Sequence, residues 1–184
     1  NLNFLKKLGN VSCYEPHKKT KKFIKKKFIK IKVLKIVKKK YDLIVLTDVI
    51  EHVKNDKALI NKLTKNLNSG GYLLCTAPAF NFLFSKIDIR FKHYRRYTKD
   101  TTIKLLNKNL KLIKFSYFNF FLFLPISFSI LMIKIFNFKN IHVEKNPNPI
   151  INFVLYLIFS SESFFLSKFN FPFGISSLII CKKR

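Results

Sequence analysis

The apolar positions in the first part of the chain follow the short runs of an α/β protein. Residues 10–15, NVSCYE, and 28–34, FIKIKVL, favour strands, and a Lys-rich amphipathic stretch, 18–27, lies between them. Residues 41–48, YDLIVLTD, form a continuous apolar run, which is typical of a parallel strand covered on both faces. The pattern predicts two strands joined by a helix, followed by a third, buried strand.

A helix and a further strand are expected next. Residues 55–67, NDKALINKLTKNL, have helical periodicity, with Asn55 or Asp56 as the N-cap and a Gly-Gly pair after the segment. The apolar face of this helix consists of Ala58, Leu59, Leu63 and Leu67. Residues 72–78, YLLCTAP, are the next strand. Strands and helices that alternate in this way predict a doubly wound, mostly parallel α/β sheet with right-handed crossovers.

The second half of the chain begins with a long polar and aromatic segment, residues 79–97. It is longer than most connections in compact domains, and connections of this length are more often functional. A helix at 99–109, a strand near 110–118 and a final strand in the tail, 174–184, are expected to complete the sheet.

Two apolar segments interrupt this second half. The run 115–133 contains no charged residue and is long enough to cross a membrane. Its Asn, Pro and Ser residues, and its place inside an α/β domain, favour a hairpin that packs on the core or on a membrane surface. The second segment, 150–167, contains Glu162, which makes it a poor membrane span. Together they predict an apolar helical insertion over 115–170, before the last strand.

The charge of the chain is strongly positive. It has 36 Lys and Arg residues against 9 Asp and Glu residues, a formal net charge of +27, which suits nucleic acid or an anionic membrane. Almost all of this charge is Lys, which A/T-rich codons specify. Arginine, which is preferred for phosphate and guanine contacts, occurs only at Arg90, Arg95, Arg96 and Arg184. Nucleic acid is therefore not the favoured partner.

Cysteines and histidines are scattered along the chain. Cys13, Cys75 and Cys181 have neither metal-binding nor redox spacing, which indicates reduced, buried thiols and a cytoplasmic protein. The 4 His residues are equally dispersed, so no metal site is predicted.

The few acids gather at the end of one predicted strand. Those between residues 42 and 56 are Asp42, Asp48, Glu51 and Asp56. Ligands of doubly wound sheets bind at the carboxyl ends of strands, where Asp48 and, after the first strand, Glu15 are placed. One such carboxylate can accept hydrogen bonds from both hydroxyls of a ribose, and the cluster would attract a cationic ligand. Acids at strand ends are also common without a ligand, and His52 could simply brace a helix.

Longer motifs carry a family resemblance. Residues 41–80, YDLIVLTDVIEHVKNDKALINKLTKNLNSGGYLLCTAPAF, combine a strand ending in Asp, a hydrophobic-Glu-His step, a helix, a Leu-x-x-Gly-Gly turn and a strand ending in Pro. This block resembles class I S-adenosylmethionine-dependent methyltransferases. Residues 85–106, with HYRRY, and the tail PFGISSLIICKKR resemble a narrower subgroup. The resemblance implies a Rossmann-like methyltransferase fold and S-adenosylmethionine as the cofactor.

The sequence departs from this family in three places. The family's first strand and its Gly-rich loop, which cradles the methionine end of the cofactor, have no counterpart. Their place is before Asn1, and residues 1–9 resemble the end of the helix that follows that loop. The acid often found after the third strand is absent, and Lys92 stands where the subgroup often has Gly. The resemblance therefore implies that residues 1–184 are a single partial methyltransferase domain, truncated at its amino terminus.

The resemblance also assigns site residues. Glu15 matches the ribose-binding acid, and the expected cofactor-binding residues are Glu15, Pro16, Thr47, Asp48 and His52. The expected catalytic residues are His93 and His52, because a base near neutral pH is needed when the acceptor is a hydroxyl or amine. His93 is preferred for contact with the acceptor, since it lies in the segment that would cover the pocket.

The expected substrate-binding residues are Asp88, Tyr94, Arg95, Arg96 and Tyr97. Arg95 and Arg96 could bind a carboxylate or phosphate of the acceptor. A structural alternative stays open, in which either arginine pairs with Asp88 or Asp100 and only fixes the segment.

The sequence thus predicts a methyltransferase acting on a small-molecule, saccharide or lipid-like acceptor. Two alternatives remain: a basic protein that binds membranes peripherally without catalysis, and an RNA-directed methyltransferase. The enzyme and membrane hypotheses are compatible, since a lipid-like acceptor would use both. The expected location is the cytoplasm, with peripheral contact at the inner face of an anionic membrane.

Overall fold

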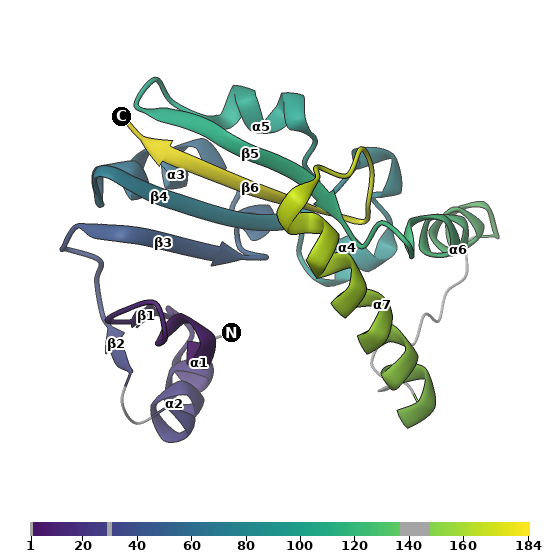
Figure 1. Cartoon of the computed structure of the whole chain (residues 1–184), viewed down its shortest axis with the longest axis horizontal. Coiled ribbons are helices and arrows are strands. Elements are labelled where there is room, and N and C mark those ends of the chain that lie inside the picture. The colour runs from purple at the N-terminus through teal and green to yellow at the C-terminus, as the bar shows by residue number, and fades with distance from the viewer. Residues whose placement is uncertain (1, 29–30, 137–147) are drawn as a thin grey trace. The chain divides into compact units, whose positions relative to one another are not determined.

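The computed structural model describes residues 2–28, 31–136 and 148–184. The chain divides into two compact units, Asn1–Lys39 and Lys40–Arg184, whose elements are labelled in Figure 1. Each unit has its own sheet.

The first unit is a pair of parallel strands joined by a helix. Strand β1 (Ser12–Tyr14) pairs with β2 (Lys32–Leu34), and α2 (Lys18–Lys27) connects them after a short α1 (Leu2–Leu5). Helix α2 is amphipathic as expected and buries Ile24. The strand predicted at 28–34 begins later, because the backbone N–H of Phe28 still donates to Ile24 O (2.8 Å) and caps α2. Residues 29–30 of that prediction lie outside the described residues.

The second unit contains a four-stranded sheet in the order β3-β4-β6-β5. The strands are β3 (Tyr41–Thr47), β4 (Leu67–Pro78), β5 (Leu110–Phe118) and β6 (Ser176–Lys183). β3 and β4 are parallel, whereas β6 runs antiparallel to both of its neighbours. The predicted α/β class and the final strand are confirmed, and Figure 1 shows these four strands side by side.

Strand β3 packs one face against the core of its unit. Ile44 and Leu46 pack against the core of the unit, but Leu43, on the other face, is 39 % exposed. Cover of the face that carries Leu43 therefore stays a prediction. Hydrophobicity alone marks β3 as a strand without showing that it lies at the edge of its sheet.

Helix α3 (Asp56–Lys65) begins where the sequence places it. The side chain of Asn55 accepts from the backbone N–H of Ala58 (3.0 Å), which confirms the cap. The buried face is shifted from the predicted one: Ile60 and Leu63 are buried, whereas Ala58 is exposed.

Strand β4 starts earlier than predicted, at Leu67 rather than residue 72. The Gly-Gly pair lies inside this strand. Gly70 has a φ of +74°, and a Cβ at Gly71 would meet the backbone oxygen of Tyr41 at 3.1 Å. Glycine suits both positions, because Gly70 has a positive φ and a side chain at Gly71 would need the neighbouring backbone to move by a few tenths of an ångström.

The segment 79–97 has secondary structure of its own. It contains the 3-10 helix η2 (Asn81–Leu83) and helix α4 (Lys86–Arg90), which begins with a capping box formed by Ser85 and Asp88. Helix α5 (Lys99–Leu105) ends before the predicted residue 109, because Leu106 is already extended as the chain turns towards β5.

The apolar segments form two helices, α6 (Phe123–Phe136) and α7 (Pro149–Lys168). The uncharged run 115–133 is not one membrane span, since residues 115–118 belong to β5. By contrast, α7 has the length and the apolar composition of a membrane-crossing helix, although it contains Glu162. Residues 137–147 of the predicted insertion lie outside the described residues. In Figure 1, α7 projects away from the sheet.

The core of the second unit lies between the sheet and its helices. It includes Ile50, Ile60, Leu67, Leu73, Cys75, Ala77, Tyr97, Phe115, Ile179 and Cys181. Cys75 and Cys181 are buried free thiols as predicted, whereas Cys13 is only partly buried.

The turn into β6 depends on Gly174. A Cβ at this position would overlap the backbone oxygen of Phe118 and lie 2.9 Å from its carbonyl carbon. Backbone cannot move aside as a flexible side chain can, so Gly174→Ala is expected to lower the free energy of unfolding by about 3 kcal/mol. Urea denaturation measures this loss, and Ser163→Ala on the exposed side of α7 should change stability by less than about 0.5 kcal/mol. Equal stability of the two variants would contradict the close approach.

Candidate functional site

The carboxyl end of β3 is a tight turn held by its neighbour β4. Asp48 follows the strand with a φ of +52°, in the left-handed region where Asp is tolerated better than most residues. Its backbone N–H donates to the Thr76 backbone oxygen (3.1 Å), and the Thr76 hydroxyl donates to Asp48 Oδ1 (3.1 Å). Asp48 and Thr47 are both exposed, so the carboxylate faces solvent from a fixed backbone.

A 3-10 helix, η1 (Ile50–His52), continues from this turn. Ile50 is fully buried and anchors it to the core, Glu51 is also fully buried, and His52 is exposed. The hydrophobic-Glu-His step of the sequence thus places one acid inside the protein and one imidazole outside it.

The segment before α5 returns alongside η1. The backbone N–H of Tyr94 donates to Glu51 O (2.7 Å), and the N–H of Tyr97 donates to Pro78 O (2.8 Å). These two bonds place His93 beside His52. The centroids of the two imidazole rings are 4.7 Å apart, and the ring planes meet at 76°. The two predicted catalytic histidines, 41 positions apart in the sequence, are therefore neighbours.

His93 is oriented by a buried carboxylate. Its Nδ1 lies 3.0 Å from Asp88 Oδ1, and Asp88 also accepts two bonds from Arg96, Nε to Oδ1 and NH2 to Oδ2, both 2.9 Å. Burial opposes ionisation of Asp88, but the hydrogen bonds from Arg96, His93 and the Ser85 backbone outweigh it and lower the pKa of the carboxyl. A charged Asp88 assigns the proton of His93 to Nδ1 and leaves a lone pair on Nε2.

The neighbouring arginine has a different partner. Arg95 NH1 donates to Asp56 Oδ2 (2.9 Å) and NH2 to the Lys54 backbone oxygen (2.7 Å). The Tyr97 hydroxyl also donates to Asp56 Oδ2, at 2.9 Å, and Tyr97 is buried. Asp56 therefore joins the start of α3 to the HYRRY segment.

Most of the predicted substrate-binding residues have partners inside the protein, whereas Tyr94 is exposed. Arg96 and Asp88 form the structural pair that the sequence left open as an alternative, and Arg95 pairs with Asp56 rather than with Asp88 or Asp100. Tyr94 has a side chain that is 53 % exposed. A role in acceptor binding stays a prediction for all five residues, Asp88, Tyr94, Arg95, Arg96 and Tyr97.

The predicted cofactor residues lie in both units. Glu15 and Pro16 follow β1 in the first, whereas Thr47, Asp48 and His52 follow β3 in the second. Glu15 Oε1 accepts from the backbone N–H of His17 (2.7 Å), which orients the carboxylate and leaves its other oxygen for an external donor. A carboxylate oxygen accepts hydrogen bonds, and the ribose hydroxyls of S-adenosylmethionine are suitable donors.

Glu51 belongs to the acid cluster that was predicted to face a cationic ligand, but the structure buries it completely. Burial raises its pKa to about 7; its own backbone amide opposes this rise, and the charge of Asp48 adds to it. Neither carboxylate oxygen has a well-formed hydrogen bond within the described part of the chain. The sequence indicates this residue as the acid directly before His52. Hydrophobic periodicity does not show whether the side chain of Glu51 or that of His52 points into the protein.

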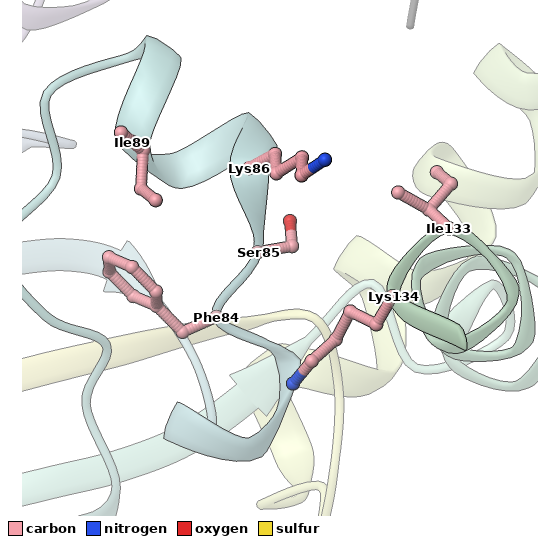
Figure 2. Close-up of a pocket in the computed structure, with 6 residues that line it drawn as sticks. All are labelled: Phe84, Ser85, Lys86, Ile89, Ile133 and Lys134. Atoms are coloured by element: carbon pink, nitrogen blue, oxygen red, sulfur yellow. The ribbon is translucent and has the colours of Figure 1, made fainter. Parts of the chain in front are cut away.

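A separate hollow lies between α4 and α6. Figure 2 shows its six lining residues, Phe84, Ser85, Lys86, Ile89, Ile133 and Lys134. It measures about 260 Å³ and its walls are mostly apolar. The sequence predicted none of these residues.

Comparisons with known proteins identify the family and the fold. Residues 10–113 match the family model of a methyltransferase domain, which spans both units. No curated protein matches the sequence.

Solved structures with the same fold are methyltransferases of low sequence identity. A protein of Sulfolobus solfataricus described as a type 11 methyltransferase has 11 % identity and a TM-score of 0.54, over 100 % of this chain and 76 % of that one. A protein of Bacillus halodurans described as a methyltransferase has 14 % identity and the same TM-score, over 94 % and 82 %. The plantazolicin methyltransferase BpumL, in complex with a substrate analog and S-adenosylhomocysteine, has 13 % identity and a TM-score of 0.58, over 100 % and 72 %. The chain belongs to the methyltransferase domain family, and its fold is that of solved methyltransferases.

Proposed function

We propose that this methyltransferase acts on a lipid-like acceptor at the surface of an anionic membrane. The observation that carries the proposal is the exposed apolar surface of α7, of which only 6 % of an 18-residue window is buried. Its exposed residues include Ile150, Ile151, Phe153, Val154, Tyr156, Leu157 and Phe159. Soluble proteins rarely leave so large a contiguous apolar surface in water.

The attachment of α7 favours insertion into one leaflet over a full span. Glu162 accepts from the backbone N–H of Phe120 (3.0 Å), and Lys114 Nζ donates to Leu166 O (2.6 Å). These bonds hold the last two turns of α7 to the body of the unit. The first 11 residues, Pro149–Phe159, can enter a bilayer and extend about 16 Å, roughly half of the 30 Å hydrocarbon core.

Charge complements this apolar surface. In residues 119–136 and 148–175 the only acid is Glu162, which is 3 % exposed, so no carboxylate there faces a membrane. Lys134 and Lys168 lie in the last turns of α6 and α7. Each Lys near an anionic surface contributes about 1 kcal/mol of attraction, which supports an anionic membrane as the partner.

The hollow beside α6 gives an apolar chain a place near this surface. It lies between α4, which carries the buried Asp88, and α6, whose exposed apolar residues include Leu124 and Phe128. An acyl or prenyl chain could occupy it while the polar end of the acceptor extends towards solvent.

The residues at the strand ends can support the chemistry. When bound, S-adenosylmethionine supplies a methyl group on a positively charged sulfur, which is transferred by in-line displacement. In the second unit, the carboxylate of Asp48 provides a hydrogen-bond acceptor and negative charge for such a ligand. An acceptor hydroxyl has to lose a proton, and the imidazoles of His52 and His93 are suited to assist, either as bases or by binding a cation.

Methyl transfer to matched acceptors tests this function. The chain is incubated with methyl-labelled S-adenosylmethionine, anionic phosphatidylglycerol vesicles and a phenol offered either bare or with a long prenyl chain. We expect at least tenfold more label on the prenylated phenol, and loss of this preference when the vesicles are omitted. Equal labelling of both phenols, or label only on added transfer RNA, would contradict a lipid-like acceptor.

A further inference from the structure

We propose that Glu51, His52 and His93 form a binding site for a divalent transition-metal ion, with Zn²⁺ as the best-suited ion. Each of these three residues offers one ligand atom, and the three atoms lie within 4.8 Å of one another. Two residues come from η1 and the third from the returning segment, so the folded second unit is needed to assemble the site.

The buried carboxylate of Glu51 is the second, independent observation. Glu51 is fully buried, yet neither of its oxygens has a hydrogen-bond partner among the described residues. Because an isolated carboxylate loses several kcal/mol of hydration on burial, buried acids in native proteins take up a proton, pair with a donor or coordinate a metal. The nearby arginines do not serve Glu51, since Arg95 bonds Asp56 and Arg96 bonds Asp88.

The environment of His93 is that of a metal-binding imidazole. Metal-ligating histidines nearly always donate their second ring N–H to a carboxylate or carbonyl, which fixes the tautomer and the ring plane. Asp88 does this for His93 at Nδ1 (3.0 Å), and Arg96 in turn fixes Asp88. The lone pair of Nε2 is therefore held in place for a ligand.

The geometry requires only a small adjustment. Ligand atoms around a tetrahedral Zn²⁺ are about 3.4 Å apart, given bonds of about 2.1 Å, so the three groups need to close by roughly 1.4 Å or less. Rotation of the exposed His52 side chain can supply much of this movement. Two imidazoles and one carboxylate suit Zn²⁺ and similar ions, whereas Mg²⁺ and Ca²⁺ prefer oxygen ligands alone.

The site has the composition of a catalytic rather than a structural metal centre. Three protein ligands leave at least one coordination position open, whereas structural zinc sites use four. Two of the three ligands, Glu51 and His52, follow Asp48 beyond the carboxyl end of β3. The inference concerns metal binding, so its test does not depend on methyl transfer or on the acceptor.

Cobalt binding tests the site in the complete chain. Co²⁺ is colourless to faintly pink in water and absorbs visible light strongly when protein ligands hold it in four- or five-coordinate geometry. We expect the purified protein to develop this absorption at one Co²⁺ per chain, and Zn²⁺ to abolish it by displacement. Absence of the absorption in a folded protein would overturn the proposal.

Three ligand variants and one control localise the binding. Glu51→Gln, His52→Gln and His93→Gln should each weaken Co²⁺ binding by more than about 100-fold, because loss of an outer-shell partner alone costs 10–100-fold. His17→Gln removes a histidine of the first unit and should leave affinity unchanged. His52 is exposed, so its variant is expected to fold even if the Glu51 variant does not. Unchanged affinity in His52→Gln, or an equal loss in His17→Gln, would overturn the site.

Discussion

Replacing Arg96 by Met is expected to lower the free energy of unfolding by about 3–5 kcal/mol, because it leaves the buried carboxylate of Asp88 without its main partner. Arg96 is 7 % exposed and donates two bonds of 2.9 Å to Asp88, which is 1 % exposed. Arg95→Met is the matched control: the Arg95 side chain is 38 % exposed, so solvent screens its pair with Asp56, and its loss should cost about 1 kcal/mol or less. Urea denaturation of both variants measures the difference.

The pH dependence of stability gives a second readout of the same pair. The folded-state pKa of Asp88 is lowered, so its contribution is present above the ordinary Asp value near pH 4 and is lost as pH falls through the lowered pKa. Arg96→Met should lose part of this acid-sensitive contribution, whereas Arg95→Met should retain it. Equal destabilisation by the two variants at neutral pH would contradict a structural pair at Asp88.

The elements that the sequence predicted well are those in which local pattern and tertiary structure agree. Strand β5 occupies the predicted residues 110–118, and Asn55 caps α3 as expected. Strand β4 shows where local pattern fails. Its first five residues include two glycines, which weaken strand propensity, but the backbone of Tyr41 and Asp42 lies close to Gly71, so the tertiary structure favours a small residue there.

The candidate site was predicted in its members but not in its arrangement. The motifs singled out His52 and His93, yet no local signal shows that they touch. Their contact depends on the backbone bond between Tyr94 and Glu51, which joins residues 43 positions apart. Arg95 is a similar case: the sequence offered acids of its own segment as partners, and the fold supplies Asp56 from the start of α3.

Helix α7 shows a limit of hydropathy. A single acid in an apolar segment argues against membrane insertion. In the structure, however, Glu162 points towards the body of the unit and accepts a hydrogen bond from the backbone N–H of Phe120. On an α-helix, residue 162 lies about 180° from residue 153, since each residue turns about 100°. The face that contains Phe153 is therefore directed away from the body of the unit, and it includes Ile150 and Leu157 at helical spacing.

Substituting this face should abolish membrane binding. The triple variant Ile150→Gln, Phe153→Gln and Leu157→Gln is expected to reduce partition into anionic phosphatidylglycerol vesicles by more than about 100-fold. Burial of one such side chain is worth about 1.5–3 kcal/mol, so three give a loss of several kcal/mol even when they are only partly inserted. Gln keeps a good helix propensity, so α7 should remain folded. Vesicle flotation measures the partition, with far-UV circular dichroism as the check on folding.

A matched triple variant separates this face from general hydrophobicity. Ile103→Gln, Ile113→Gln and Tyr72→Gln alter three exposed apolar residues on α5, β5 and β4, outside α6 and α7. Vesicle binding of this variant should stay within about twofold of the original chain, because none of these residues lies on the proposed insertion surface. Electrostatic attraction alone would behave differently: both variants keep every lysine, so binding driven only by the +27 charge would survive in each and disappear at high salt. If the α7 variant still floats with the vesicles at low salt, the apolar face of α7 does not cause membrane binding, and charge does.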